Sequence, residues 1–218
     1  FLSEHSDSVT KGYLYILDDL LDNVEICGEI NLGTSEIPIN KILGTRTAAR
    51  SNAFAGNFMP LLPENTEFGA KWCKLYESHI RDGIREPIKV YEYLNRYFVQ
   101  EGNKRVSVLK YLGAVAIEAR VTRLIPKRDE SNKQISIYYE FLDFDRRAIF
   151  DNLWFSQRGG FTALVNLVEG WQQEHPDNDT PTADLINAAF KSFRLCYKEV
   201  GFSSIPITSG DAFLEYLK

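Results

Sequence analysis

The sequence is poor in the residues that build metal sites and disulfide frameworks. Its 218 residues include three cysteines and three histidines, and no two cysteines have CxxC spacing. Such spacing is typical of zinc and redox sites. An odd number of dispersed cysteines indicates a protein of a reducing compartment. We therefore expect a cytoplasmic location, no disulfide framework and no structural metal.

Long hydrophobic runs are missing as well. No segment approaches the roughly 20 apolar residues that are needed to cross a membrane. The first residues also lack the basic, apolar and small-residue pattern of a signal peptide. The chain begins at Phe1 rather than methionine, as a fragment of a longer protein would, so an upstream signal is left open. We expect no membrane partner.

The chain has no excess of positive charge. It contains 25 Lys and Arg against 30 Asp and Glu, for a net charge of −5. Non-specific nucleic-acid binding depends on clustered cations, so the composition disfavours it, although a local basic patch is still compatible. Hydrophobic residues make up 44% and aromatic residues 13% of the chain. This composition is sufficient for one large domain or two small ones with a packed core.

The first half of the sequence mixes predicted helices and strands. Residues 13–22 have helical spacing, and we place them in an N-terminal helical extension over residues 1–34. Residues 35–126 then form the predicted core domain. Its predicted elements are a strand over 35–43, a long loop over 44–65, a helix over 68–82, a hairpin over 88–99 that turns at Asn95 and Arg96, a helix over 103–112 and a strand over 115–125.

The second half is predicted to be a mainly helical lobe over residues 127–218. The polar, proline-led stretch 126–134 indicates a domain edge. Residues 135–141 alternate as a strand does, and helical spacing follows over 161–171 and 182–201. The predicted fold class is α+β, with a small mixed sheet and packed helices followed by this lobe.

The junction between the hairpin and the next helix has the composition of an anion site. Gly102 allows a close approach of the backbone, and N–H groups at a helix start favour an anion. Lys104 and Arg105 can neutralise phosphate charge, and Arg105 has a forked geometry suited to it. The alternative is an ordinary turn whose first-turn cations are solvated.

These elements and their residues resemble the ParB/sulfiredoxin-like superfamily. The resemblance rests on ESHIRDGIREPIKVYEY (77–93) and YFVQEGNKRVSVLKYLGAVAIEARV (97–121). The residues near the positions of the family signature are Ser78, Ile80, Gly83, Pro87, Ile88, Val90, Gly102, Arg105 and Gly113. The resemblance implies a ParB N-terminal-like domain of bacterial type that binds nucleotide phosphates at the glycine turn and the helix start.

The phosphate site implied by this resemblance draws on three parts of the chain. Its predicted residues are Gly102, Asn103, Lys104, Arg105 and Ser107 at the glycine turn, Thr45, Arg46 and Arg50 in the long loop, and Arg123 near the last strand. We expect a nucleotide or phosphometabolite as ligand, with Mg²⁺ as a candidate companion. Asn103 stands where sulfiredoxins have their catalytic cysteine, and an amide cannot act as a thiolate nucleophile.

Three functions are compatible with these features. The first is a regulatory nucleotide- or phosphate-binding domain, for which a homodimer is left open. The second is a transcription regulator or partition-like protein that binds DNA through Lys191, Arg194 and Lys198 of the helical lobe. The third is a kinase or nuclease in which Glu101 is a general base or a magnesium ligand; its alternative is a solvated turn residue.

Overall fold

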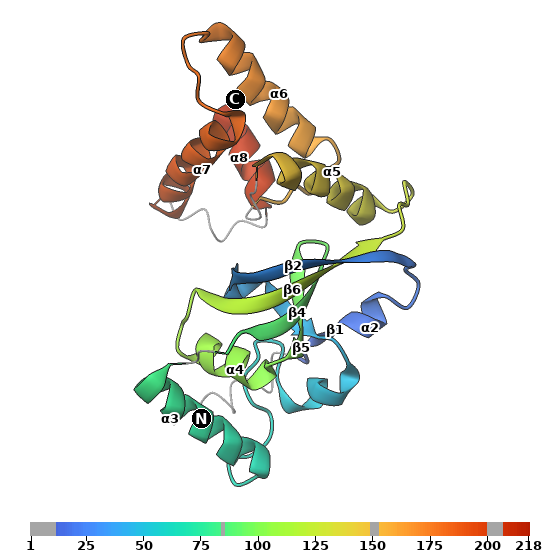
Figure 1. Ribbon diagram of the computed structural model, residues 1–218, viewed down its shortest axis with the longest axis vertical. Helices are drawn as coiled ribbons and strands as arrows, with labels where there is room; N and C mark the ends of the chain where they lie inside the picture. Colours follow the sequence, from blue (N-terminus) through green and yellow to red (C-terminus); the bar gives the residue numbers. More distant parts are fainter. Residues whose placement is uncertain (1–11, 84–85, 149–152, 200–206) are drawn as a thin grey trace. The chain divides into compact units, whose positions relative to one another are not determined.

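The computed structural model describes residues 12–83, 86–148, 153–199 and 207–218. The chain divides into two compact units, residues 1–127 and residues 128–218, and each unit is described by itself (Figure 1). The first combines a mixed sheet with helices and the second is helical among its described residues, so the chain is of the α+β class.

The first unit is built on a six-stranded mixed sheet in the order β1-β3-β5-β4-β6-β2. The strands are β1 Tyr15–Ile16, β2 Ile26–Pro38, β3 Ile42–Thr45, β4 Ile88–Tyr93, β5 Arg96–Glu101 and β6 Ala116–Pro126. Pairs β1–β3, β3–β5 and β4–β6 are parallel, while β4–β5 and β2–β6 are antiparallel. Strand β5 therefore lies inside the sheet, between β3 and β4.

Helices cover this sheet because its inward positions are apolar. The helices of the unit are α2 Leu17–Leu20, α3 Glu67–Asp82 and α4 Asn103–Tyr111, with 3-10 turns η2 Ile39–Lys41 and η3 Ala48–Ala53. Val106 and Leu109 of α4 share a buried cluster with strand residues such as Val90 and Val99. A second cluster joins Leu17 to Phe98 and Leu124. Burial of apolar side chains is the dominant favourable term for such packing.

The second unit contains helices α5 Lys133–Ala148, α6 Gly160–Glu174, α7 Thr182–Glu199 and α8 Ser209–Leu217. Its core is aromatic. Phe161 lies with ring centroids 4.8 Å from Phe155 and 6.0 Å from Phe141. Phe213 similarly contacts Phe190 at 5.1 Å. Edge-on and tilted aromatic pairs of this kind stabilise a core beyond their buried area.

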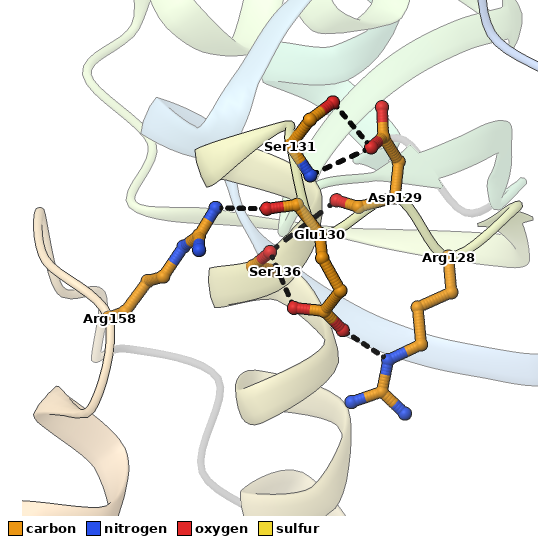
Figure 2. Close-up of polar contacts among 6 residues, drawn as sticks. All are labelled: Arg128, Asp129, Glu130, Ser131, Ser136 and Arg158. Atoms are coloured by element: carbon orange, nitrogen blue, oxygen red, sulfur yellow. Dashed lines mark hydrogen bonds and ion pairs between the residues drawn. The ribbon is translucent and has the colours of Figure 1, made fainter.

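The entry into α5 is fixed by polar contacts (Figure 2). Asp129 accepts hydrogen bonds from the backbone N–H and the hydroxyl of Ser131, at 2.8 and 2.6 Å. The hydroxyl bond contributes most to lowering the pKa of Asp129. Arg158 points at this turn and donates to the carbonyl of Glu130 at 2.6 Å. Asn132 then caps the helix through the N–H groups of the first turn.

Two of the predicted elements were wrong. Residues 13–22 are not one helix: they contain β1 and the four-residue α2. Residues 26–34 belong to β2 of the sheet, so the predicted helical extension over 1–34 is not supported by its described part. Residues 135–141 belong to α5 rather than to a strand, because Tyr138, Phe141 and Leu142 are buried at helical spacing.

Two further expectations need smaller corrections. The hairpin turns at Leu94 and Asn95, one residue earlier than predicted, and both have positive φ values of 50° and 59°. Such values are those of the two-residue turn that matches strand twist, formed here without glycine. The predicted loop over 44–65 contains the end of β3 and the turn η3.

Gly44 provides a test of the parallel β1–β3 pair. A Cβ atom at Gly44 would lie 1.9 Å from the carbonyl oxygen of Tyr15, whereas one at Gly28 of β2 would meet nothing within 4 Å. We expect Gly44→Ala to lower the free energy of unfolding by about 1–3 kcal/mol, as overpacking does. Gly28→Ala should change it by less than about 0.5 kcal/mol. Denaturant unfolding measures both, and equal stability of the two variants would contradict the pairing.

Candidate functional site

The turn between β5 and α4 requires glycine. Gly102 has φ 110° and ψ 18°, a conformation that L side chains rarely adopt. A Cβ atom there would also lie 2.5 Å from Cγ2 of Ile88. The backbone of Gly102 therefore packs directly on β4, and α4 begins at the next residue, Asn103.

The start of α4 is electrostatically positive. The first N–H groups of any helix have no acceptor within it, and the helix dipole adds positive potential at this end. The residue before α4 is Gly102, which offers no capping side chain, and its first turn contains no acidic residue. In contrast, Thr66 caps α3 and Thr208 caps α8. An anion at this end of α4 would be stabilised by the exposed dipole.

A cavity of about 280 Å³ opens at this turn. Its lining residues are Phe54, Phe68, Gln100, Glu101, Gly102, Asn103 and Lys104. The rings of Phe54 and Phe68 form an apolar wall, 5.1 Å apart and edge to face. The ammonium of Lys104 lies 4.6 Å from the centroid of the Phe68 ring. The cavity thus combines an aromatic wall, a helix start and a cation.

Asn103 connects this turn to Thr45 of β3. The side chain of Asn103 is 9% exposed, and its Nδ2 donates to the Thr45 hydroxyl at 3.4 Å. That hydroxyl in turn donates to the carbonyl of Val99 at 3.1 Å. The structure therefore brings together Thr45, Gly102, Asn103 and Lys104 among the predicted phosphate residues.

Arg105 is engaged with the protein rather than directed at the cavity. Its guanidinium donates to the carbonyls of Glu86 and Pro87, at 2.7 and 3.1 Å, and its side chain is 14% exposed. It also lies 3.7 Å from the carboxylates of Glu86 and Glu101. Arg105 therefore anchors the segment before β4 onto α4, and its contact with phosphate stays a prediction.

Ser107 is also structural. It is fully buried, and its hydroxyl accepts a hydrogen bond from Nε1 of Trp72 at 2.8 Å. Trp72 lies on α3, so this bond joins the two helices. Ser107 is not among the residues that line the cavity, and its contact with phosphate stays a prediction.

Glu101 is a weaker base than its position suggested. A hydrogen bond from Lys89, at 2.7 Å, is the largest cause that lowers the pKa of the Glu101 carboxyl. A general base at neutral pH works best with a raised pKa. Among the described residues, no three His, Cys, Asp or Glu side chains gather as a metal site would require.

Arg46 and Arg123 lie away from this cavity. Arg46 donates to the hydroxyl of Tyr91 and stacks 4.6 Å from the centre of its ring. Arg123 pairs with the carboxylate of Glu92, which is 1% exposed. Neither residue is among those that line the cavity, and their contact with phosphate stays a prediction. The side chain of Arg50 lies outside the described residues.

The predicted DNA-binding residues lie on α7. Lys191 and Arg194 are exposed, and the side chain of Lys198 lies outside the described residues. Their contact with DNA stays a prediction.

Sequence reasoning missed one part of the site and one buried cation elsewhere on α4. The aromatic wall of Phe54 and Phe68 is formed by residues separated from Gly102 in the chain, so only tertiary packing reveals it. Lys110 of α4 was also missed. Its ammonium donates to the carbonyl of Ile42 at 2.9 Å and lies 4.6 Å from the ring centroid of Phe58. Burial lowers the pKa of Lys110 to about 8.

Comparison with known proteins gives only weak likenesses, among solved structures. The sequence matches no family model and no curated protein. Among solved structures, the chain is similar to sulfiredoxin from Arabidopsis thaliana, with 23% sequence identity and a TM-score of 0.29. The aligned region covers 40% of this chain and 82% of the sulfiredoxin chain. No helix among the described residues combines the length and apolar character needed to cross a membrane.

The buried Glu92–Arg123 pair should carry stability rather than binding. Arg123→Met would remove the ion pair that Arg123 makes with the buried carboxylate of Glu92, and removal of one partner of a buried pair costs about 3–5 kcal/mol of folding free energy. Arg120→Met, at an exposed position of the same strand, is the matched control and should cost less than about 0.5 kcal/mol. Chemical denaturation compares the two, and a small loss for Arg123→Met would show that the pair is dispensable.

Lys110 should make stability depend on pH. Its folded pKa of about 8 lies below the value of an unfolded lysine, roughly 10.4, so the unfolded state holds more protons between these two values. The contribution of Lys110 to the free energy of unfolding therefore rises as pH increases through this window. Relative to Lys110→Met, the wild type should gain stability from pH 7 to pH 10. Lys71→Met, at an exposed position of α3, controls for loss of a lysine, and parallel pH profiles of wild type and Lys110→Met would contradict the expectation.

Proposed function

We propose that this protein binds a phosphate-bearing small molecule, a nucleotide or a phosphometabolite, at the start of α4. The observation that carries the proposal is the Gly102 turn. The helix that follows it begins at a cavity of about 280 Å³ and has no acidic residue in its first turn. Backbone N–H groups and the dipole together make such a terminus favourable for phosphate.

Lys104 adds the charge that a phosphate needs. It lines the cavity and its ammonium lies over Phe68, 4.6 Å from the ring centroid. The ammonium therefore lies at the aromatic wall of the cavity. A cation in the first turn of a helix is mildly unfavourable by itself, and a bound anion would remove that cost.

Binding with a regulatory role is better supported than catalysis at this turn. Lys89 holds the pKa of Glu101 low, which weakens its case as a general base. Asn103 offers an amide where a sulfiredoxin would have a thiol, so thiolate chemistry has no nucleophile at this position. The ParB-like reading of the motif leads to the same proposal of a phosphate ligand.

DNA binding through α7 is a second candidate. Lys191 and Arg194 are both exposed one turn apart on this helix, an arrangement that suits contacts with backbone phosphates. Duplex DNA affinity that falls steeply with salt would support it, and no detectable binding at low salt would reject it.

Lys104→Gln tests the phosphate proposal. Titration calorimetry with inorganic phosphate, pyrophosphate, ATP and CTP, with and without Mg²⁺, should detect binding of at least one compound. The variant should bind that compound about tenfold more weakly, because a charge-assisted contact worth roughly 1.4 kcal/mol is lost.

Lys71→Gln provides the matched control. It removes the same charge from an exposed position of α3, where the side chain is 63% exposed, and should leave the affinity within about twofold of wild type. An equal loss in both variants would indicate a diffuse charge effect. Absence of binding by all four phosphate compounds would reject the proposed function.

A further inference from the structure

The carbonyl oxygen of the Asn103 side chain is a buried acceptor that no described residue satisfies. Oδ1 of Asn103 is inaccessible to solvent and receives no hydrogen bond from the part of the chain that the structure describes. Buried polar atoms in native proteins nearly always have a partner, and each exception needs a reason. This oxygen belongs to a residue that lines the cavity at the start of α4.

The orientation of the amide follows from its neighbours. The hydroxyl of Thr45 has one proton, which it donates to the carbonyl of Val99 at 3.1 Å. Its oxygen can then only accept, and it accepts from Nδ2 of Asn103 at 3.4 Å. Turning the amide over would require the Thr45 hydroxyl to give up its bond to the carbonyl of Val99. Oδ1 of Asn103 is therefore the end that awaits a donor.

We infer that the ligand of this cavity carries a hydroxyl group close to its phosphate, and that this hydroxyl donates to Oδ1 of Asn103. The inference rests on the proposed function. Asn103 is the first residue of α4, and its backbone N–H is one of the groups that would bind the phosphate. The same residue would thus contact phosphate through its backbone and a neighbouring hydroxyl through its side chain.

The size and lining of the cavity narrow the ligand class. About 280 Å³ is slightly below the range of 300–1,000 Å³ that holds drug-sized ligands. The chemistry fits a phosphorylated polyol or sugar, with its carbon skeleton against Phe54 and Phe68 and its hydroxyl on Asn103. A phosphate monoester without a hydroxyl would leave the buried acceptor unsatisfied, which is the basis of selectivity in polar sites.

The test compares glycerol 3-phosphate with propyl phosphate, which has the same number of carbons and no hydroxyl. Both are titrated at pH 8, where a phosphate monoester has lost its second proton and cannot itself donate. The wild type should bind glycerol 3-phosphate about three- to tenfold more tightly, the value of one hydrogen bond. Asn103→Leu should bind both compounds with the same affinity.

Two further variants keep this result interpretable. Asn40→Leu changes an exposed asparagine of η2 that does not line the cavity and should keep the preference for glycerol 3-phosphate. Asn103→Asp retains an acceptor, so it should keep the preference for glycerol 3-phosphate. Its added negative charge should weaken binding of both phosphate compounds. This variant provides the test if Asn103→Leu does not fold.

The outcomes separate this inference from the proposed function. Equal affinity of the wild type for the two compounds, or a preference that survives in Asn103→Leu, would overturn the role of Asn103 while phosphate binding stands. Loss of the preference in Asn103→Asp would overturn it as well. Failure of both compounds and of inorganic phosphate to bind would overturn the phosphate site together with the inference.

Discussion

The contact between the backbone of Gly102 and the side chain of Ile88 determines where helix α4 begins. No Cβ atom separates the two, because one would lie 2.5 Å from Cγ2 of Ile88. The chain can therefore leave β5 and enter α4 without a loop. This places the helix start at the end of an internal strand and holds Asn103 against Thr45. The cavity, its cation and its aromatic wall all depend on that placement.

Local signals in the sequence were sufficient for the elements around this contact. Gly83 ends α3, β4 and β5 form a hairpin, and Gly102 precedes α4, as predicted. The failures lie where tertiary packing overrides a pattern. Leucines at helical spacing near residue 17 predict a helix over residues 13–22, yet only four residues are helical there. In residues 135–141 the same apolar side chains satisfy both an alternating and a helical pattern, and burial in the second unit selects the helix.

The candidate site was only partly predictable for a related reason. The sequence indicates that cations stand in the first turn of α4, but not where each charged group goes. The stem of Lys104 stays at the cavity, whereas Arg105 is drawn to carbonyls of Glu86 and Pro87, which lie 19 and 18 residues earlier. Unsatisfied carbonyl groups attract a guanidinium strongly because it has five donors in a fixed fork. Phe54 and Phe68 lie in segments whose sequence gives no local indication that they line a cavity.

In the described part of the chain, helices α4 and α6 each start after a glycine in the left-handed conformation, and they differ in one respect. At α6, the N–H of Gly159 donates to both oxygens of the Glu140 carboxylate, at 2.8 and 2.9 Å. The carboxylate of Glu140 therefore serves as a built-in counter-anion at the start of α6. An anion from solution would have to compete with this carboxylate. An acidic side chain at position 103 or 104 would ligate α4 in the same way. The first turn of α4 contains no carboxylate that could ligate its N–H groups in this way.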